Sequence, residues 1–124
     1  SVIIRYMNVS DPAACSSNSI SQIAFIYIHM YGINVIYTMK PGKRDEFLAG
    51  VTASGAQAAV RGEEGCLQYD YFTSVDNPDK LLLLEKWTNR EAQKVHMGQP
   101  HMALIQEVKN RCAADTILET YDLP

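Results

Sequence analysis

Two histidines lie five positions apart in the segment His96-Met97-Gly98-Gln99-Pro100-His101. Histidine changes its protonation state near neutral pH, and general base catalysis contributes roughly 10²–10⁴-fold to a rate. His96 precedes a Gly-x-Pro sequence that ends a helix, so its ring could point toward a neighbouring sheet. We therefore predict His96 as the catalytic base. His101 is a candidate substrate-binding residue, with a helix cap or a subunit contact as the alternative.

The same pair of histidines raises the question of a metal site. At this spacing a continuous helix would put the two rings on different faces, and no cysteine lies nearby. Glu85 is the only obvious third ligand. We therefore expect no metal at this position.

Five further side chains are candidates for holding a substrate. Trp87 shares a predicted strand face with Glu85 and could stack on an aromatic ring, or it could belong to the core. Glu85 could orient a base or bond the backbone. Tyr69 and Tyr71 could donate phenolic hydrogen bonds, or they could form a subunit interface. Asn34, in the first predicted strand, could bond a substrate oxygen or remain solvated.

The apolar residues of the chain switch between strand and helix periods. We predict a strand over 33–39, a helix over 43–60, a hairpin of strands over 66–75 and 81–87, a helical region from 91 that breaks at 98–100 and resumes at 102, and a strand over 116–121. The order βαββαβ is typical of a ferredoxin-like α+β fold with a four-stranded antiparallel sheet.

Two helices would cover only one face of such a sheet. Tyr69, Tyr71 and Trp87 could not all face solvent without forming a large apolar patch. A second copy of the chain that stacked its sheet on the first would bury them, so we predict a homodimer. A space left between the two sheets would be an apolar cavity with a few polar groups, as in small-molecule sites.

The composition excludes several classes of protein. The chain has 124 residues, 47% of them hydrophobic, and a formal charge of −3. Nothing in this balance indicates binding to nucleic acid or to an anionic membrane. Three widely spaced cysteines do not suit a disulfide framework, which favours a reducing compartment such as the cytoplasm.

The first thirty residues carry almost no charge. Residues 20–39 are mostly apolar, but assigning 33–39 to a strand leaves about a dozen, too few for a membrane span. We therefore divide the chain into an N-terminal extension, 1–29, and one domain, 30–124. The extension is either an addition upstream of a natural start at Met30 or an extra edge strand over 22–29.

Three motifs carry a family resemblance. They are Glu63-Glu64-Gly65-Cys66 before the second strand, Leu84-Glu85-Lys86-Trp87 at the end of the third, and the stretch from His96 to Met102. Together, and in this order, they resemble the antibiotic biosynthesis monooxygenase domain, and most closely its bacterial quinol monooxygenase branch. The resemblance covers roughly residues 31–123.

This resemblance implies a homodimeric α/β barrel that oxidises a small electron-rich aromatic, such as a quinol or an anthrone, with O₂. It also implies that neither a metal nor a flavin takes part. His96 occupies the first histidine of the family's His-x-x-x-x-His stretch, which supports its assignment as the base.

Other functions on the same fold remain open. An isomerase of small phosphorylated or keto compounds should want basic residues in the cavity, and Lys86 is the only strand candidate. A haem-degrading oxygenase shares an asparagine in the first strand, but its tryptophan and later histidine are replaced by His96 and Gln106. The third alternative is a non-catalytic dimer that binds a small ligand.

Overall fold

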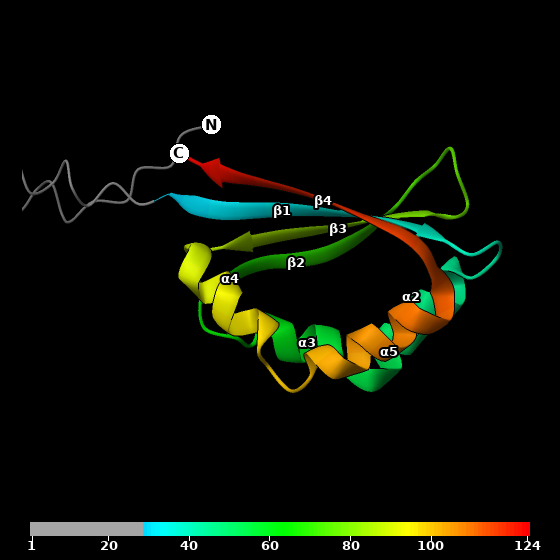
Figure 1. Cartoon of the computed structure of the whole chain (residues 1–124), viewed down its shortest axis with the longest axis horizontal. Helices are drawn as coiled ribbons and strands as arrows, with labels where there is room; N and C mark the ends of the chain where they lie inside the picture. The colour runs from blue at the N-terminus through cyan, green and yellow to red at the C-terminus, as the bar shows by residue number, and fades with distance from the viewer. Residues whose placement is uncertain (1–28) are drawn as a thin grey trace, which may run out of the picture.

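The computed structural model describes residues 29–124, and predictions that fall on earlier residues lie outside this range, including the extra strand over 22–29. The elements follow in the order β1 (Met30–Met39), α2 (Arg44–Ser54), α3 (Ala56–Arg61), β2 (Cys66–Thr73), β3 (Lys80–Trp87), α4 (Arg90–Met97), α5 (Met102–Cys112) and β4 (Ala113–Leu123). The strands form one antiparallel sheet in the order β2-β3-β1-β4. The predicted ferredoxin-like fold is confirmed (Figure 1).

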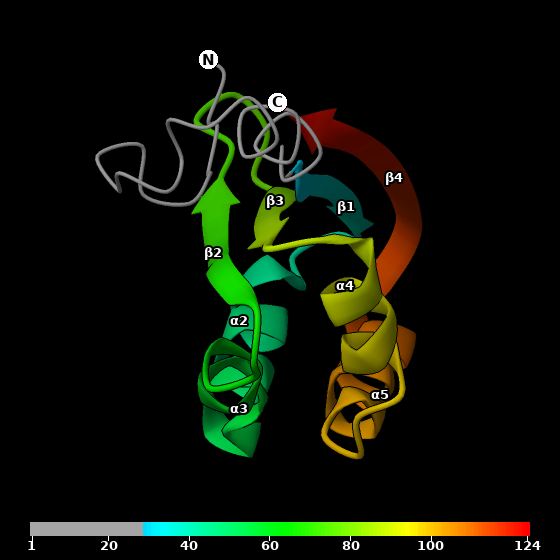
Figure 2. The ribbon, with the colours of Figure 1, turned by 90° about the vertical axis from the view of Figure 1, so that its left-hand side faces the viewer.

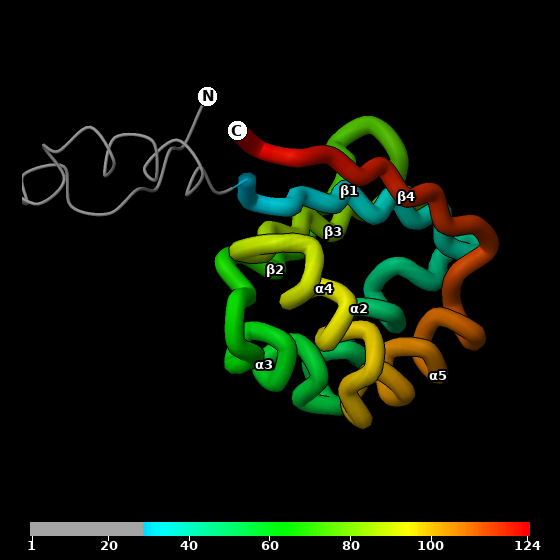
Figure 3. Tube along the Cα trace, turned by 60° about the vertical axis from the view of Figure 1, so that its left-hand side comes forward, coloured from blue at the N-terminus to red at the C-terminus, as the bar shows by residue number. Residues whose placement is uncertain are grey.

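The four helices of the described residues lie on one side of the sheet (Figure 1). Seen from the side, α2 and α3 lie toward β2, and α4 and α5 lie toward β4 (Figure 2). The end of β4 returns to the start of β1, where Leu123 pairs with Met30 (Figure 3). None of the helices within residues 29–124 is long and apolar enough to cross a membrane.

Glycine and proline positions determine where the helices end. The predicted helix over 43–60 is wrong as a single element, because Gly55 adopts a left-handed conformation (φ 73°) that ends α2 and begins α3. The predicted break before α5 is confirmed by the end of α4 at Met97. Asn89 caps α4, since its side-chain oxygen accepts a 2.8 Å hydrogen bond from the Ala92 amide.

Alternate residues of the central strands form the core beneath the helices. In β1 and β3 these positions are almost fully buried, and Phe47 and Val51 of α2 pack against them. The members from the two strands are Tyr31, Ile33, Val35, Tyr37, Met39, Leu81, Leu83, Glu85 and Trp87. This face of the sheet therefore supplies both the core and, at Glu85, a buried carboxyl group.

The opposite face of the sheet carries an apolar row. Phe72, Leu82, Ile36 and Ile117 are register partners across all four strands, and Phe72 and Ile117 are 47% and 48% exposed. We call these four residues the open-face row. The prediction that Tyr69, Tyr71 and Trp87 form the patch on this face is wrong. Strand alternation places all three on the helix side, where Tyr69 and Trp87 are 2% and 0% exposed.

Gly65 holds the loop before β2 close to the start of α4. Its φ is +85°, and a Cβ atom there would lie 2.6 Å from the Ala92 Cβ and 2.7 Å from the Thr88 Oγ1. We expect Gly65→Ala to lower the free energy of unfolding by about 2–4 kcal/mol, since backbone strain and overpacking add. Gly42→Ala is the matched control, because Gly42 has a similar φ of +75° but open space around it. Equal losses in urea unfolding of the two variants would contradict the packing argument.

Candidate active site

A cavity of about 250 Å³ lies between the sheet and helices α4 and α5. A cavity of roughly 150 Å³ can hold benzene, so this one has room for a substituted aromatic ring. Its walls are mainly apolar, and Met97 and Leu118, 59% and 64% exposed, line it from α4 and β4. This cavity differs from the predicted space between the sheets of two subunits, because it lies between the sheet and helices of a single chain.

Among the polar side chains that line the cavity, four are ionisable groups of different chemistry on four different elements. They are His96 from α4, Glu85 from β3, Tyr69 from β2 and Lys109 from α5. Three of the predicted site residues thus meet at one cavity. Lys109 is the only lysine or arginine among the described residues that line it, and its Nζ lies 5.6 Å from the centre of the Tyr37 ring.

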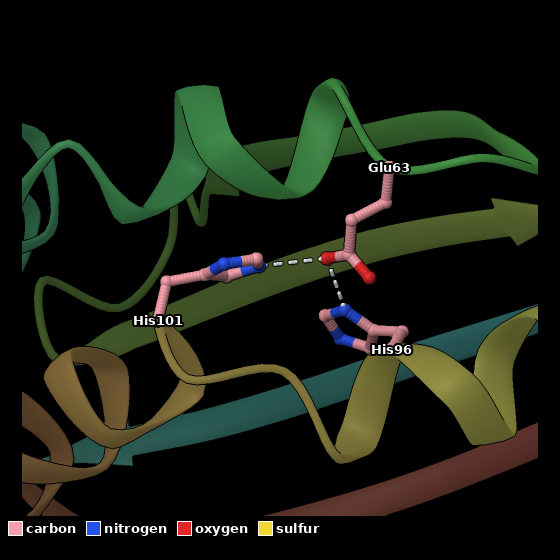
Figure 4. A group of neighbouring side chains, drawn as sticks. All are labelled: Glu63, His96 and His101. Carbon is pink, nitrogen blue, oxygen red and sulfur yellow. Dashed lines mark hydrogen bonds and ion pairs between the residues drawn. The ribbon is translucent and has the colours of Figure 1, made fainter.

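His96 is buried and held in a fixed orientation. Its ring is 1% exposed and stacks on Trp87 at a centroid distance of 4.6 Å. Its Nδ1 lies 2.7 Å from Oε2 of Glu63, in the loop between α3 and β2 (Figure 4). An ionised carboxylate can only accept, so Nδ1 carries the proton, and Nε2 of the neutral ring keeps its lone pair. The sequence prediction that the helix end directs this ring to the sheet is confirmed.

His101 contacts the same carboxylate from the far end of the segment that joins α4 and α5. Its Nε2 lies 2.8 Å from the same Glu63 oxygen, and its side chain is 19% exposed (Figure 4). His96 lies in α4 and His101 is the N-cap residue of α5, so the argument that they face apart on one continuous helix does not apply. His101 contacts the site through Glu63 and does not line the cavity.

Glu85 and Trp87 form the wall behind the His96 ring. The Trp87 indole N–H donates a 3.0 Å hydrogen bond to Oε1 of Glu85, which lies 3.9 Å from Nε2 of His96. Burial is the main cause that raises the pKa of the Glu85 carboxyl above its ordinary value, and the charge of Glu63 adds to it. Glu85 therefore favours its neutral form more than a solvated glutamate does.

The raised pKa of Glu85 makes stability depend on pH. The folded carboxyl binds a proton at higher pH than the unfolded one, whose pKa is about 4.5. The free energy of unfolding should therefore fall as pH rises from 4.5 through the folded pKa. Glu85→Gln keeps an acceptor for Trp87 and removes this titration. We expect the free energy of unfolding of the variant, measured in urea, to rise relative to that of the wild type as pH increases. Parallel curves of unfolding free energy against pH for the two proteins would contradict this.

The two tyrosines of β2 occupy different positions. Tyr69 lines the cavity, and burial raises the pKa of its phenol, so it stays protonated and can donate a hydrogen bond. Tyr71 does not line the cavity; its hydroxyl is buried, and burial is the main cause that raises its pKa to about 12. Tyr69 is therefore the better candidate for contact with a substrate.

Trp87 and Asn34 do not contact the cavity. Trp87 is fully buried behind the His96 ring, so it supports that ring and cannot stack on a ligand. Asn34 lies on the opposite face of the sheet, where its side-chain oxygen accepts a 3.2 Å hydrogen bond from the Tyr121 hydroxyl. Lys86, the strand cation considered for an isomerase, alternates onto that opposite face too.

Two residues of the site were missed by sequence reasoning. Glu63 is 33 residues from His96, so no local spacing connects them. Its only signal was the loop Glu63-Glu64-Gly65-Cys66 in the family resemblance. Lys109 lies within the helix predicted to resume at 102, and nothing in that segment distinguishes it from a surface lysine.

The triad of Glu63, His96 and His101 has the chemistry of a metal-ligand set. Each residue offers one ligand atom, and these atoms all lie within 4.8 Å of one another. Two imidazoles and a carboxylate are donors that suit transition metals.

The family model for antibiotic biosynthesis monooxygenase matches residues 30–108. Two curated relatives are similar over about half of the chain. A Bacillus subtilis protein named "Putative monooxygenase YcnE" is 42% identical over 66 residues, which are 51% of this chain and 64% of the relative. A Mycobacterium tuberculosis protein named "Putative monooxygenase Rv0793" is 36% identical over 67 residues, which are 51% of this chain and 65% of the relative.

The match thus spans less than two thirds of either curated relative. A solved structure from Bacteroides thetaiotaomicron, described as a conserved protein of unknown function and possible oxidoreductase, superposes with a TM-score of 0.67 at 26% identity. The superposition covers 76% of this chain and 97% of the Bacteroides chain. The fold is therefore shared over nearly the whole of that protein.

Proposed function

The chain belongs to the antibiotic biosynthesis monooxygenase family, and we propose that it is a monooxygenase that oxidises a small electron-rich aromatic with O₂, without metal or flavin. The observation that carries the proposal is the placement of His96. His96 lines a mainly apolar cavity, and its Nδ1 is held by Glu63, which leaves Nε2 as the nitrogen that can accept a proton. Family membership supports the reaction class, and the cavity supports the size and the aromatic character of the substrate.

The first step is removal of a hydroxyl proton from the bound aromatic. His96 Nε2 accepts it, and Glu63 stabilises the resulting imidazolium through the 2.7 Å contact at Nδ1. His96 is the catalytic residue in this scheme, and Glu63 is a positioning residue. Lys109 supplies a positive charge at the same cavity, where it favours the substrate anion.

The anion then reacts with O₂ directly. It transfers one electron to O₂, and the resulting radical and superoxide combine to form a carbon–oxygen bond. The peroxide takes back the proton from His96, its O–O bond breaks, and the hydrogen at that carbon leaves with the distal oxygen as water, which makes the carbon a carbonyl. A quinol thus becomes a hydroxyquinone plus water, and the aromatic supplies every electron that reduces O₂.

Oxygen uptake tests this function. The purified protein, treated with a chelator and free of flavin, is mixed with hydroquinone or an anthrone, and O₂ consumption is followed with an electrode. Uptake that scales with protein concentration supports the proposal. Uptake that appears only after iron or flavin is added, or no uptake with any member of the panel, would contradict it.

We also propose that two copies of the chain pair through the open-face row. The row extends across all four strands, and two of its four residues are about half exposed, as expected of a surface that a partner covers. Leu82→Lys places a charge at the centre of this row. We expect the wild type to sediment as a dimer at micromolar concentration and the variant as a monomer. A monomeric wild type would contradict the pairing.

The cysteines support action in a reducing compartment such as the cytoplasm. Cys66 and Cys112 are both free thiols, and burial is the main cause that raises the pKa of Cys66 to about 11. The third cysteine, Cys15, lies outside the described residues.

A further inference from the structure

We propose that Glu63, His96 and His101 form a binding site for a divalent transition metal such as Zn²⁺, and that the ion switches the enzyme off. The carboxylate and two imidazoles come from three separate segments: the loop before β2, the end of α4 and the start of α5 (Figure 4). Three protein ligands with room for a fourth, exchangeable one is the usual arrangement of an open zinc site.

The distances allow an ion between the three ligand atoms. The two histidine nitrogens lie 2.7 and 2.8 Å from one carboxylate oxygen, and all three atoms lie within 4.8 Å of one another. A tetrahedral ion with bonds of about 2.0–2.1 Å holds its ligands roughly 3.3 Å apart. Side-chain movements of about one ångström reach that arrangement, and the His101 side chain, 19% exposed, has room to make them.

The charge around the triad favours a cation. The carboxyl groups of Glu63 and Glu85 are 10% and 8% exposed and flank the same histidine. Within residues 29–124 neither forms an ion pair with lysine or arginine, and their ion-pair contacts are with histidines alone. Buried carboxylates are normally paired or metal-bound, so a divalent ion would neutralise the charge of Glu63, whose ion-pair partners within residues 29–124 are His96 and His101.

The ion would change which nitrogen of His96 carries its proton. Without metal, Nδ1 holds the proton and Nε2 is free to accept another. A metal bound at Nδ1 requires a lone pair there, so the proton of the neutral ring moves to Nε2. Nε2 then donates and can no longer act as a base. The loss of activity on metal binding rests on the proposed function, whereas metal binding itself does not.

Calorimetric titration of the full chain with Zn²⁺ tests the site. We expect one ion per chain for the wild type and for Glu64→Gln, the exposed neighbour of Glu63. Glu63→Gln and His101→Ala should weaken binding by at least the roughly 10- to 100-fold that losing a supporting residue around a metal costs. His101→Ala, at a partly exposed helix start, keeps the test valid if Glu63→Gln fails to fold. No binding, or equal affinities in all four proteins, would overturn the site.

The position of the proton on the His96 ring can be measured separately from metal binding. Long-range ¹H–¹⁵N spectra of the histidine rings distinguish a proton on Nδ1 from one on Nε2. We expect the His96 proton on Nδ1 in chelated protein and on Nε2 after Zn²⁺ is added, with loss of O₂ uptake that a chelator restores. Zinc binding without the tautomer change would overturn the switch. Absence of O₂ uptake in chelated protein would instead count against the proposed function and leave the metal site standing.

Discussion

Replacing His96 by glutamine is expected to lower kcat for O₂ uptake by about 10²–10⁴-fold, the usual contribution of a general base. Glutamine is close to histidine in size and can still bond Glu63, but its amide cannot take a proton near neutral pH. The measurement is O₂ consumption by chelated protein at saturating hydroquinone.

A purely structural role for His96 would give different activities for the His96 variants. The ring packs on Trp87 and Tyr69, at centroid distances of 4.6 and 5.9 Å, so its loss also disturbs packing. Added imidazole should restore part of the turnover of His96→Ala, because it fills the space and supplies a base. A glutamine variant with wild-type kcat, or an alanine variant that imidazole does not rescue, would contradict the role as base.

Replacing Trp87 by alanine should cost about 3–5 kcal/mol of unfolding free energy, the range for large-to-small changes at a buried aromatic. Trp87 is fully buried, packs on His96 and donates its N–H to Glu85. Domains of this size are stable by only about 5–15 kcal/mol, so this loss is a large share of the total stability.

Trp87→Phe separates packing from hydrogen bonding. Phenylalanine retains an aromatic ring against His96 but leaves the buried Glu85 carboxyl without its indole donor, which should cost about 1–3 kcal/mol. Urea unfolding of the three proteins measures both effects. An alanine variant within about 1 kcal/mol of the wild type would show that Trp87 is not part of the core.

Local patterns in the sequence predicted the fold correctly except where one glycine changed the backbone. Alternation in the strands, the turn at Asp76–Asp79 and the Asn89 cap each depend on neighbouring residues, so they can be read from the chain. Gly55 was read as a packing residue within one helix, because its left-handed conformation has no signature in the surrounding apolar pattern.

The site was predicted only in part, because its geometry depends on contacts between distant segments. His96, Glu85 and Tyr69 were found from residue type and strand face. Glu63 was not found, since its link to His96 arises only when the loop before β2 packs beside α4. Trp87 was assigned to the substrate because alternation gives a strand face but not the depth at which a side chain is buried.

The cavity on the helix side of the sheet was not predicted, for a related reason. The helix side of a sheet normally closes around its core, so a space between two sheets was the simpler expectation. Here α4 and α5 are separated by the break at 98–101 and leave room above β1 and β4. The site thus depends on the break between α4 and α5 and on the contact between the loop before β2 and α4. Both are tertiary features of the fold.

The central claim is that His96 takes a hydroxyl proton from an aromatic bound in the cavity. The most direct test is an anaerobic titration with a nitrophenol, whose anion absorbs at longer wavelength than its neutral form, using chelated protein buffered below the pKa of the free phenol. Without O₂ the reaction stops at proton transfer. Wild-type protein should develop the band of the bound anion, and His96→Gln should bind the phenol without it. The anion band in both proteins, or binding to the wild type with no such band, would contradict the account.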